Sequence, residues 1–133
     1  MSAGRSSVPR ITVVNDSTEF LELMQELLGD AGYEVTTIRG DETSIDGIAA
    51  SAPDLLVIDL RLGGVDPTGW DVALMARVHD LLREVPIVIC SADADGLRQR
   101  NAEMSALADV HVLAKPFGGG DAEDLVGRLI ARG

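Results

Sequence analysis

The chain has 133 residues, of which 46% are hydrophobic and 25% charged, a composition typical of one folded domain with a single core. Its formal net charge of −11 repels phosphate backbones, which argues against direct binding to nucleic acid. No apolar run approaches the roughly 18 residues that a membrane-spanning helix needs, so we expect no membrane insertion.

Residues 1–9 are mostly small or polar, and they predict a flexible tail in front of a single domain over residues 10–133. The first residues lack the apolar segment of a secretory signal. Cys90 is the only cysteine and falls within a predicted strand, so no internal disulfide can form. These features favour a cytoplasmic protein.

Five short runs rich in Val, Ile and Leu predict buried strands. They cover Arg10–Asn15, Tyr33–Ile38, Leu55–Ile58, Ile87–Cys90 and Val110–Ala114. The third run has no polar alternation, which is expected of a strand that is covered on both faces. It delivers a carboxylate, Asp59, at its carboxyl end.

Segments with apolar residues at helical spacing separate these strands and predict helices. The first helix begins at an N-cap formed by Ser17 or Thr18 and ends at Gly32. The last is predicted over Asp121–Ala131, with Asp121 as its cap. The other three are marked by Ile45, Ile48, Ala49 and Ala52, by Leu74, Met75, Val78, Leu81 and Leu82, and by the segment Leu97–Leu107.

Strands and helices alternate along the chain, and their connections are short apart from a loop over Leu62–Gly69. This order predicts an α/β fold in which a parallel sheet carries helices on both faces, joined by right-handed crossovers. In such a sheet, ligands bind beyond the carboxyl ends of the strands. We therefore expect the candidate site at that edge.

Four reactive side chains fall at this edge of the predicted sheet. They follow or end the first, third, fourth and fifth strands: Asp16, Asp59, Ser91 and Lys115. Two carboxylates about 4 Å apart repel each other by ~1–4 kcal/mol, depending on the local dielectric. Mg²⁺ relieves such repulsion and suits one or two carboxylates with water and phosphate oxygens. A lysine and a hydroxyl opposite can bind a phosphoryl group, which an aspartate can accept as an acyl phosphate.

Each of these residues has a plainer interpretation when it is taken alone. Asp16 is compatible with a helix cap, Ser91 with a strand-end hydroxyl and Lys115 with a solvated loop lysine. Their joint placement at the ends of successive strands is what favours a phosphoryl-acceptor site.

Several other side chains are expected to be structural. His79 and His111 lack spaced Cys, His or Asp partners, so we expect them to be structural or solvent-facing rather than metal ligands. Trp70 follows the long loop and is either packed in the core or partly exposed near the site. Cys90 is expected to point into the core.

Over residues 10–132 the sequence resembles the receiver domains of two-component response regulators. The resemblance rests on P-D-L-L-V-I-D ending at Asp59, I-V-I-C-S-A containing Ser91 and L-A-K-P-F containing Lys115. It implies a single flavodoxin-like (βα)5 domain, a doubly wound parallel sheet with strand order 2-1-3-4-5. Two helices would cover one face of this sheet and three the other.

The resemblance also implies a role for each candidate residue. Asp59 would be the phospho-acceptor, and Lys115 and Ser91 would stabilise the phosphoryl group that it receives. Mg²⁺ or Mn²⁺ would be bound by Asp16, Asp59 and the backbone carbonyl of Arg61. The chain would then be a signalling phosphoprotein, not an enzyme beyond catalysing its own phosphorylation and dephosphorylation.

The implied phosphoryl donor is a sensor histidine kinase or a phosphotransfer protein. Output would come from repositioning the loop after Ser91 and the helix behind it, which would change a face that binds a downstream protein in trans. A homodimer through the face of the last two strands and helices is also compatible with the resemblance.

Two positions depart from the family pattern. Asn15 stands where the family usually carries a second acid that meets the metal through water. Its amide could still accept a hydrogen bond from such a water, but one negative charge is lost and Mg²⁺ affinity should fall. Val112 stands where the family often has the Tyr or Phe that swings inward on activation.

Two alternatives stay open at this point. Asn15 and Val112 favour a pseudo-receiver, a protein-interaction module that works without phosphorylation. A small phosphotransfer enzyme or flavin carrier on the same architecture is disfavoured, because aromatic residues make up only 3% of the chain and the first loop has no phosphate-binding glycine pattern.

Overall fold

Five parallel strands form one sheet in the spatial order β2-β1-β3-β4-β5. The structure is a computed structural model that describes residues 8–40, 44–59, 69–91, 98, 102, 106–107, 109–114 and 119–132. The strands are β1 (Arg10–Asn15), β2 (Glu34–Arg39), β3 (Leu55–Asp59), β4 (Ile87–Ser91) and β5 (Val110–Ala114). The helices bounded within the described residues are α1 (Thr18–Asp30), α2 (Ile45–Ala50), α3 (Gly69–Val78) and α6 (Gly119–Arg132).

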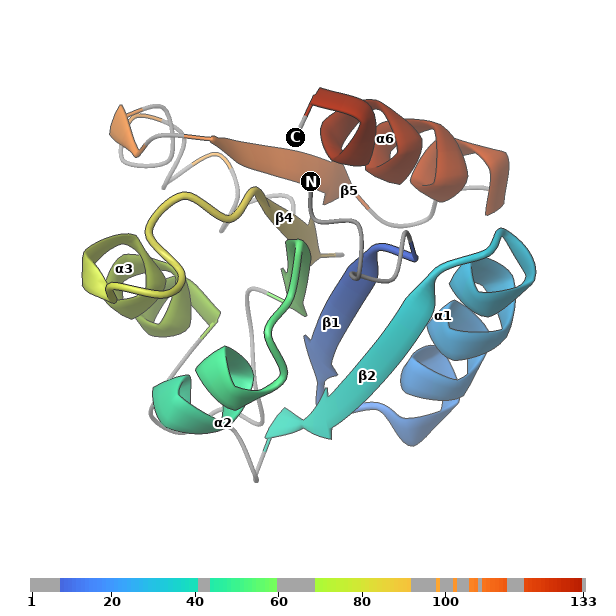
Figure 1. Ribbon diagram of the computed structural model, residues 1–133, viewed down its shortest axis with the longest axis horizontal. Coiled ribbons are helices and arrows are strands. Elements are labelled where there is room, and N and C mark those ends of the chain that lie inside the picture. The colour runs from blue at the N-terminus through green and yellow to red at the C-terminus, as the bar shows by residue number, and fades with distance from the viewer. Residues whose placement is uncertain are drawn as a thin grey trace.

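The predicted strand order and doubly wound parallel topology are confirmed (Figure 1). β3 is the middle strand, hydrogen-bonded to β1 on one side and to β4 on the other, so that Val57 pairs with Val13 and Val88 in register. Strand β2 begins and ends one residue later than predicted, at Glu34 and Arg39. The chain has the flavodoxin-like fold.

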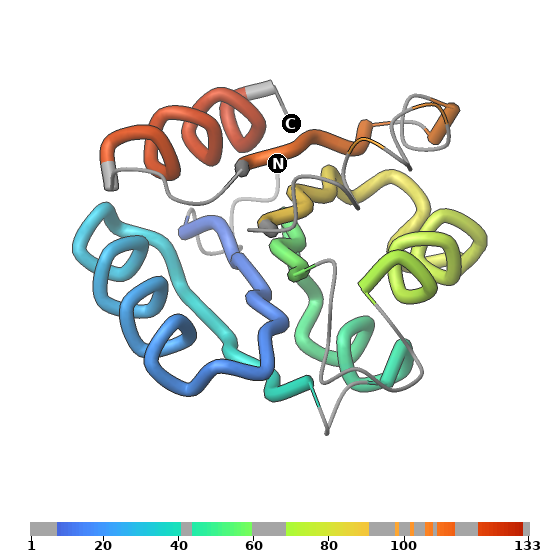
Figure 2. The backbone as a smooth tube through the Cα atoms, turned by 180° about the vertical axis from the view of Figure 1, so that it is seen from behind, coloured from blue at the N-terminus to red at the C-terminus, as the bar shows by residue number. Residues whose placement is uncertain are grey.

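Helices α1 and α6 cover one face of the sheet, and α2 and α3 cover the other, as the view from behind also shows (Figure 2). Side chains of β3 alternate between these layers: Leu55 and Val57 pack with α1 and α6, whereas Leu56 and Ile58 pack with α2 and α3. The middle strand is therefore buried on both faces, as its unbroken apolar run predicts.

The predicted fourth helix, Leu97–Leu107, lies outside the described residues except at residues 98, 102, 106 and 107. Leu107 packs against the α2–α3 layer, the side on which a third helix is expected. The predicted loop over Leu62–Gly69 is described only at Gly69, the first residue of α3. None of the helices in the described part of the chain is long and apolar enough to cross a membrane.

Helix α1 begins and ends where local chemistry predicts. The Ser17 hydroxyl caps it by accepting a hydrogen bond from the Phe20 backbone N–H at 3.2 Å. After Asp30 the chain turns at Gly32, whose φ of +101° lies in a region that residues with a Cβ rarely adopt.

Two other helix boundaries differ from the prediction. Helix α2 stops at Ala50, because the residue before Pro53 disfavours helical backbone. That residue, Ala52, has a φ of +51°. Helix α6 begins at Gly119, so Asp121 lies in its first turn and is not its cap. A carboxylate in the first turn still interacts favourably with the helix dipole.

Helix α3 buries a different face from the one predicted. Its core stripe is Gly69, Val72, Ala73 and Ala76, at the spacing i, i+3, i+4 and i+7, together with Trp70. Three of the larger residues predicted to mark this helix are exposed instead: Leu74, Val78 and Leu81 are 41%, 81% and 71% exposed. Of the other two, Met75 packs against the core, and Leu82, which follows the end of the helix, is 1% exposed. The prediction was wrong for the exposed three because small residues let this helix lie close to the sheet.

Arg77 joins the end of α3 to the start of β4. Its guanidinium donates hydrogen bonds to the backbone carbonyls of Arg83 at 2.8 Å, Leu82 at 3.4 Å and Val85. Burial lowers the pKa of this guanidinium, and the nearby charge of Asp109 opposes that effect by raising it. One charged side chain thus satisfies three carbonyls of the turn before β4.

Replacing Arg77 with Ala should lower the free energy of unfolding by about 2–4 kcal/mol, because several charge-assisted hydrogen bonds to partly buried carbonyls are lost together. This free energy is measured by urea unfolding, monitored by circular dichroism. Arg83→Ala is the matched control, since Arg83 is exposed and keeps its carbonyl, and it should change stability by less than about 0.5 kcal/mol. Equal losses in the two variants would contradict the role given to Arg77.

The same substitution at two positions of α3 tests which face of the helix is buried. Val78→Lys should change the free energy of unfolding by less than about 0.5 kcal/mol, because this side chain is exposed. Val72→Lys would place an unpaired ammonium in the core and should prevent stable folding. A large loss of unfolding free energy in Val78→Lys, measured in the same urea experiment, would show that the helix face predicted from the sequence is the buried one.

Candidate functional site

Strands β1, β3 and β4 end next to one another at the carboxyl edge of the sheet. Val14 pairs with Ile58 and Asp59 pairs with Cys90 in the parallel register. The last residues of the three strands are therefore neighbours: Asn15 on β1, Asp59 on β3 and Ser91 on β4. The ends of these three strands therefore meet at one edge of the sheet.

Asn15 contacts Asp59 directly. Its side-chain amide nitrogen Nδ2 donates a hydrogen bond to the Asp59 carboxylate oxygen Oδ2 at 3.0 Å. Its amide oxygen Oδ1 accepts a hydrogen bond from the Ser17 backbone N–H at 2.8 Å. Since an N–H must donate, the contact with Ser17 fixes which end of the amide faces Asp59. Asn15 is thus a buried group aimed at the carboxylate, with 1% of its surface exposed.

The local sequence explains this placement. Val14 and Ile58 are fully buried and anchor the two strand ends in the core, so the residue after each of them is held at the edge. Ser17 serves twice, because its N–H donates to Asn15 while its hydroxyl caps α1. The end of β1, the start of α1 and the end of β3 are therefore joined by consecutive hydrogen bonds.

Asp16 follows β1 at the same edge and is exposed, and Asp59 is partly exposed. These two carboxylates are hard oxygen donors, which fits a Mg²⁺ site of one or two carboxylates completed by water and phosphate oxygens. Within the described residues, no group of three or more His, Cys, Asp and Glu side chains could hold a metal ion.

The other predicted site residues are placed only in part. Ser91 is the last residue of β4 and lies beside Ala114 in register, so it belongs to the same edge. Lys115 and Arg61 lie outside the described residues, and their predicted roles remain predictions. The Asn15–Asp59 hydrogen bond was missed from the sequence, where Asn15 was considered only as a partner for metal-bound water.

Trp70 and Cys90 lie in the core behind the site. Trp70 is 4% exposed and belongs to the same buried cluster as Val14 and Ile58, so the packing interpretation is the correct one. Cys90 is fully buried beside Asp59 in register, as predicted.

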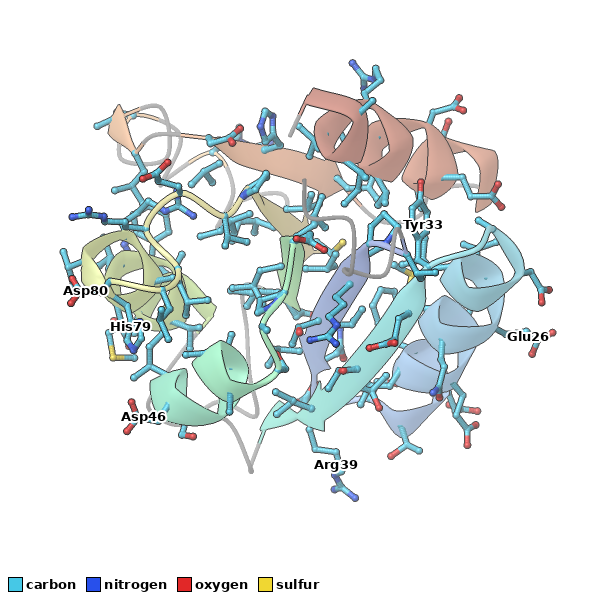
Figure 3. The ribbon with its side chains drawn as sticks, in the orientation of Figure 1. Glu26, Tyr33, Arg39, Asp46, His79 and Asp80 are labelled. Atoms are coloured by element: carbon cyan, nitrogen blue, oxygen red, sulfur yellow. The ribbon has the colours of Figure 1, made fainter. Side chains whose placement is uncertain are left out.

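The two histidines make local structural contacts. His79 accepts a hydrogen bond through Nδ1 from the Leu81 backbone N–H at 3.1 Å, and its Nε2 lies 3.9 Å from a carboxylate oxygen of Asp46 on α2 (Figure 3). His111 Nε2 lies 2.7 Å from the Asp109 carboxylate. These contacts agree with the expected structural roles.

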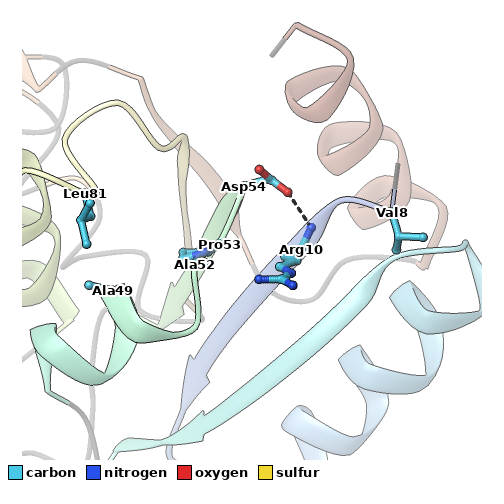
Figure 4. A pocket seen from close by; sticks show the side chains of 7 residues that line it. All are labelled: Val8, Arg10, Ala49, Ala52, Pro53, Asp54 and Leu81. Carbon is cyan, nitrogen blue, oxygen red and sulfur yellow. Dashed lines mark hydrogen bonds between the residues drawn. The ribbon is translucent and has the colours of Figure 1, made fainter. Parts of the chain in front are cut away.

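A cavity of about 530 Å³ lies at the opposite, amino-terminal edge of β1 and β3 (Figure 4). It is lined by Val8, Arg10, Ala49, Ala52, Pro53, Asp54 and Leu81. The Asp54 carboxylate accepts a hydrogen bond from the Arg10 backbone N–H at 2.8 Å, and the Arg10 guanidinium lies 3.2 Å from Glu34. These contacts brace the strand starts, away from the candidate site.

Several curated proteins have similar sequences. The chain is 32% identical over 117 residues to the transcriptional regulatory protein PrrA of Mycobacterium leprae, covering 88% of this chain and 47% of PrrA. It is 31% identical over 128 residues to protein-glutamate methylesterase/protein-glutamine glutaminase 1 of Anaeromyxobacter dehalogenans, covering 92% of this chain and 34% of that protein. It is 30% identical over 113 residues to the sensor protein GacS of Pseudomonas syringae, covering 84% of this chain and 12% of GacS. The chain thus spans less than half the length of these relatives.

Solved structures share the fold. The chemotaxis response regulator CheY4 of Vibrio cholerae superimposes with a TM-score of 0.78 at 22% identity, covering 92% of this chain and 99% of CheY4. The receiver domain of sensor histidine kinase PA1611 from Pseudomonas aeruginosa superimposes with a TM-score of 0.79 at 23% identity, covering 94% of this chain and 99% of that one. That structure was solved with a magnesium ion coordinated in its active site cleft. A putative response regulator from Chloroflexus aurantiacus gives 0.78 at 28% identity, with the same coverage.

The family model for the response regulator receiver domain matches residues 11–129, nearly the whole chain. The match agrees with the strand order, with the carboxylate at the end of the middle strand and with the structural neighbours. The chain belongs to the response regulator receiver domain family.

Proposed function

We propose that the chain receives a phosphoryl group on Asp59 from a sensor histidine kinase or a phosphotransfer protein, with Mg²⁺, and that this changes a face that binds a downstream protein. The observation that carries the proposal is the Asp59 carboxylate, partly exposed at the carboxyl end of a strand whose other residues are buried. A buried amide orients this carboxylate, and the exposed carboxylate of Asp16 follows the neighbouring strand.

In the proposed reaction an Asp59 oxygen attacks the phosphorus of a phosphohistidine. The new P–O bond forms as the P–N bond breaks, and the imidazole leaves with its electron pair. Rigid placement of the attacking carboxylate lowers the entropic part of the barrier. The anchoring of β3 on both faces and the Asn15 hydrogen bond supply this placement.

Asp16 and Asp59 would hold Mg²⁺, together with the Arg61 backbone carbonyl and, through water, Asn15. Bound Mg²⁺ supplies positive charge that balances the carboxylates and the phosphoryl oxygens. We assign Lys115 and Ser91 to the phosphoryl oxygens, where an ammonium and a hydroxyl stabilise the added charge. The magnesium ion coordinated in the PA1611 receiver domain supports this part of the proposal.

The output of the switch is also part of the proposal. Val112, 44% exposed on the edge strand β5, lies in the part of the sheet where we expect the downstream partner or a second copy of the chain to bind. The curated relatives include a sensor protein, a methylesterase and a transcriptional regulator, so the family alone does not specify the partner.

Incubation with a small-molecule phosphoryl donor and Mg²⁺ should add one phosphoryl group to the intact protein, as measured by mass spectrometry. Asp59→Asn should abolish the adduct, because an amide cannot form the acyl phosphate. The matched control is Asp54→Asn, which removes a carboxylate just before the start of the same strand and should leave the adduct unchanged. An adduct that persists in Asp59→Asn would place the acceptor elsewhere.

The neutral Asn15 beside Asp59 favours the alternative interpretation, a pseudo-receiver. Titration with Mg²⁺ separates that alternative from a working receiver. Trp70 is the only tryptophan and packs with Ile58 behind the site, so its fluorescence should report Mg²⁺ binding. Asp16→Asn should weaken that binding at least about tenfold, since one direct charged ligand is lost. If neither fluorescence nor calorimetry detects Mg²⁺ binding to the wild type, the pseudo-receiver interpretation replaces the proposal.

A further inference from the structure

The Asn15 side chain makes two contacts that serve different purposes. The first, from the Ser17 N–H to Oδ1 at 2.8 Å, shapes the turn between β1 and α1. An aspartate could make this contact equally well, because a carboxylate oxygen also accepts. The second, from Nδ2 to Asp59 Oδ2 at 3.0 Å, needs a donor, which an aspartate lacks when ionised. Only the second contact distinguishes asparagine from aspartate at this position.

The second contact stabilises the Asp59 carboxylate, as a bound cation would. A carboxylate at position 15 would point an acceptor at another acceptor across a short distance, in a place where 1% of the side chain is open to water. Such a pair is repulsive and poorly screened when it is buried. The amide replaces this repulsion with a hydrogen bond to a charged group, one of the stronger kinds in proteins.

We propose that Asn15 is a positioning residue that holds the Asp59 carboxylate in its observed orientation without a metal ion, so that the site is assembled before any cation binds. That the held carboxylate receives a phosphoryl group rests on the proposed function above. The hydrogen bond and its effect on stability do not depend on it.

Asn15→Asp isolates the positioning contact, since it preserves the shape of the side chain and the contact with Ser17 while removing the donor toward Asp59. In EDTA, this variant should melt about 5 °C or more below the wild type, because a charge-assisted hydrogen bond is replaced by repulsion. Mg²⁺ should then raise the melting temperature of the variant by more than it raises that of the wild type, because a second carboxylate strengthens cation binding.

Exchanging the two residues provides the rescue. In Asn15→Asp/Asp59→Asn the donor and the acceptor change places, so the hydrogen bond can form again with its direction reversed. In EDTA this double variant should regain most of the lost melting temperature. The control is Asn15→Asp/Asp54→Asn, which has the same formal net charge as the exchange variant but changes the carboxylate before the start of β3, and it should regain little.

Two results would overturn the proposal: an Asn15→Asp variant that melts with the wild type in EDTA, or an exchange variant no more stable than its control. If Asn15→Asp does not fold in EDTA, the exchange variant decides, since its folding supports the contact and its failure overturns it. These melting experiments need no phosphorylation. If the exchange variant regains its melting temperature but the wild type takes up no phosphoryl group, the positioning role stands and the proposed function is refuted.

Discussion

The burial of β3 on both faces is the constraint on which the rest of the site depends. Its backbone groups bond to β1 and β4, and its side chains alternate into two separate layers of core, so the strand has no freedom to slide or rotate. Asp59 is the first residue of this strand to leave the core. A carboxylate that the whole sheet holds in place can keep one orientation even though part of it faces water.

Much of this arrangement could be predicted from the sequence, and the reason is physical. A strand that is covered on both faces must be an unbroken apolar run, and alternating strands and helices allow few topologies. The run Leu55–Ile58 therefore identified the middle strand, and Asp59 after it marked the edge of the candidate site. The predictions failed where local pattern and packing disagree. In α3 the bulky residues Leu74 and Val78 give the stronger apolar signal, but Ala73 and Ala76 make the contact with the sheet.

The contact between Asn15 and Asp59 shows a different limit of sequence-based prediction. Forty-four positions separate the two residues, and their pairing depends on the register between β1 and β3 as well as on the direction of one amide group. The resemblance to the family indicates only that an amide stands where an acid is usual, which suggests a weaker metal site. The geometry shows a further effect of the amide: it donates a hydrogen bond to Asp59 at the position where an acid would repel it.

Cys90 is the nearest residue to Asp59 across the β3–β4 ladder, and its thiol lies wholly within the core, on the face covered by α1 and α6. Because Cys90 is fully buried in the described part of the chain, a thiol reagent can reach it only after this region opens. The rate at which the chain is alkylated therefore measures how often the sheet comes apart next to Asp59. The protein thus contains a natural probe of local unfolding at the position where its candidate chemistry takes place.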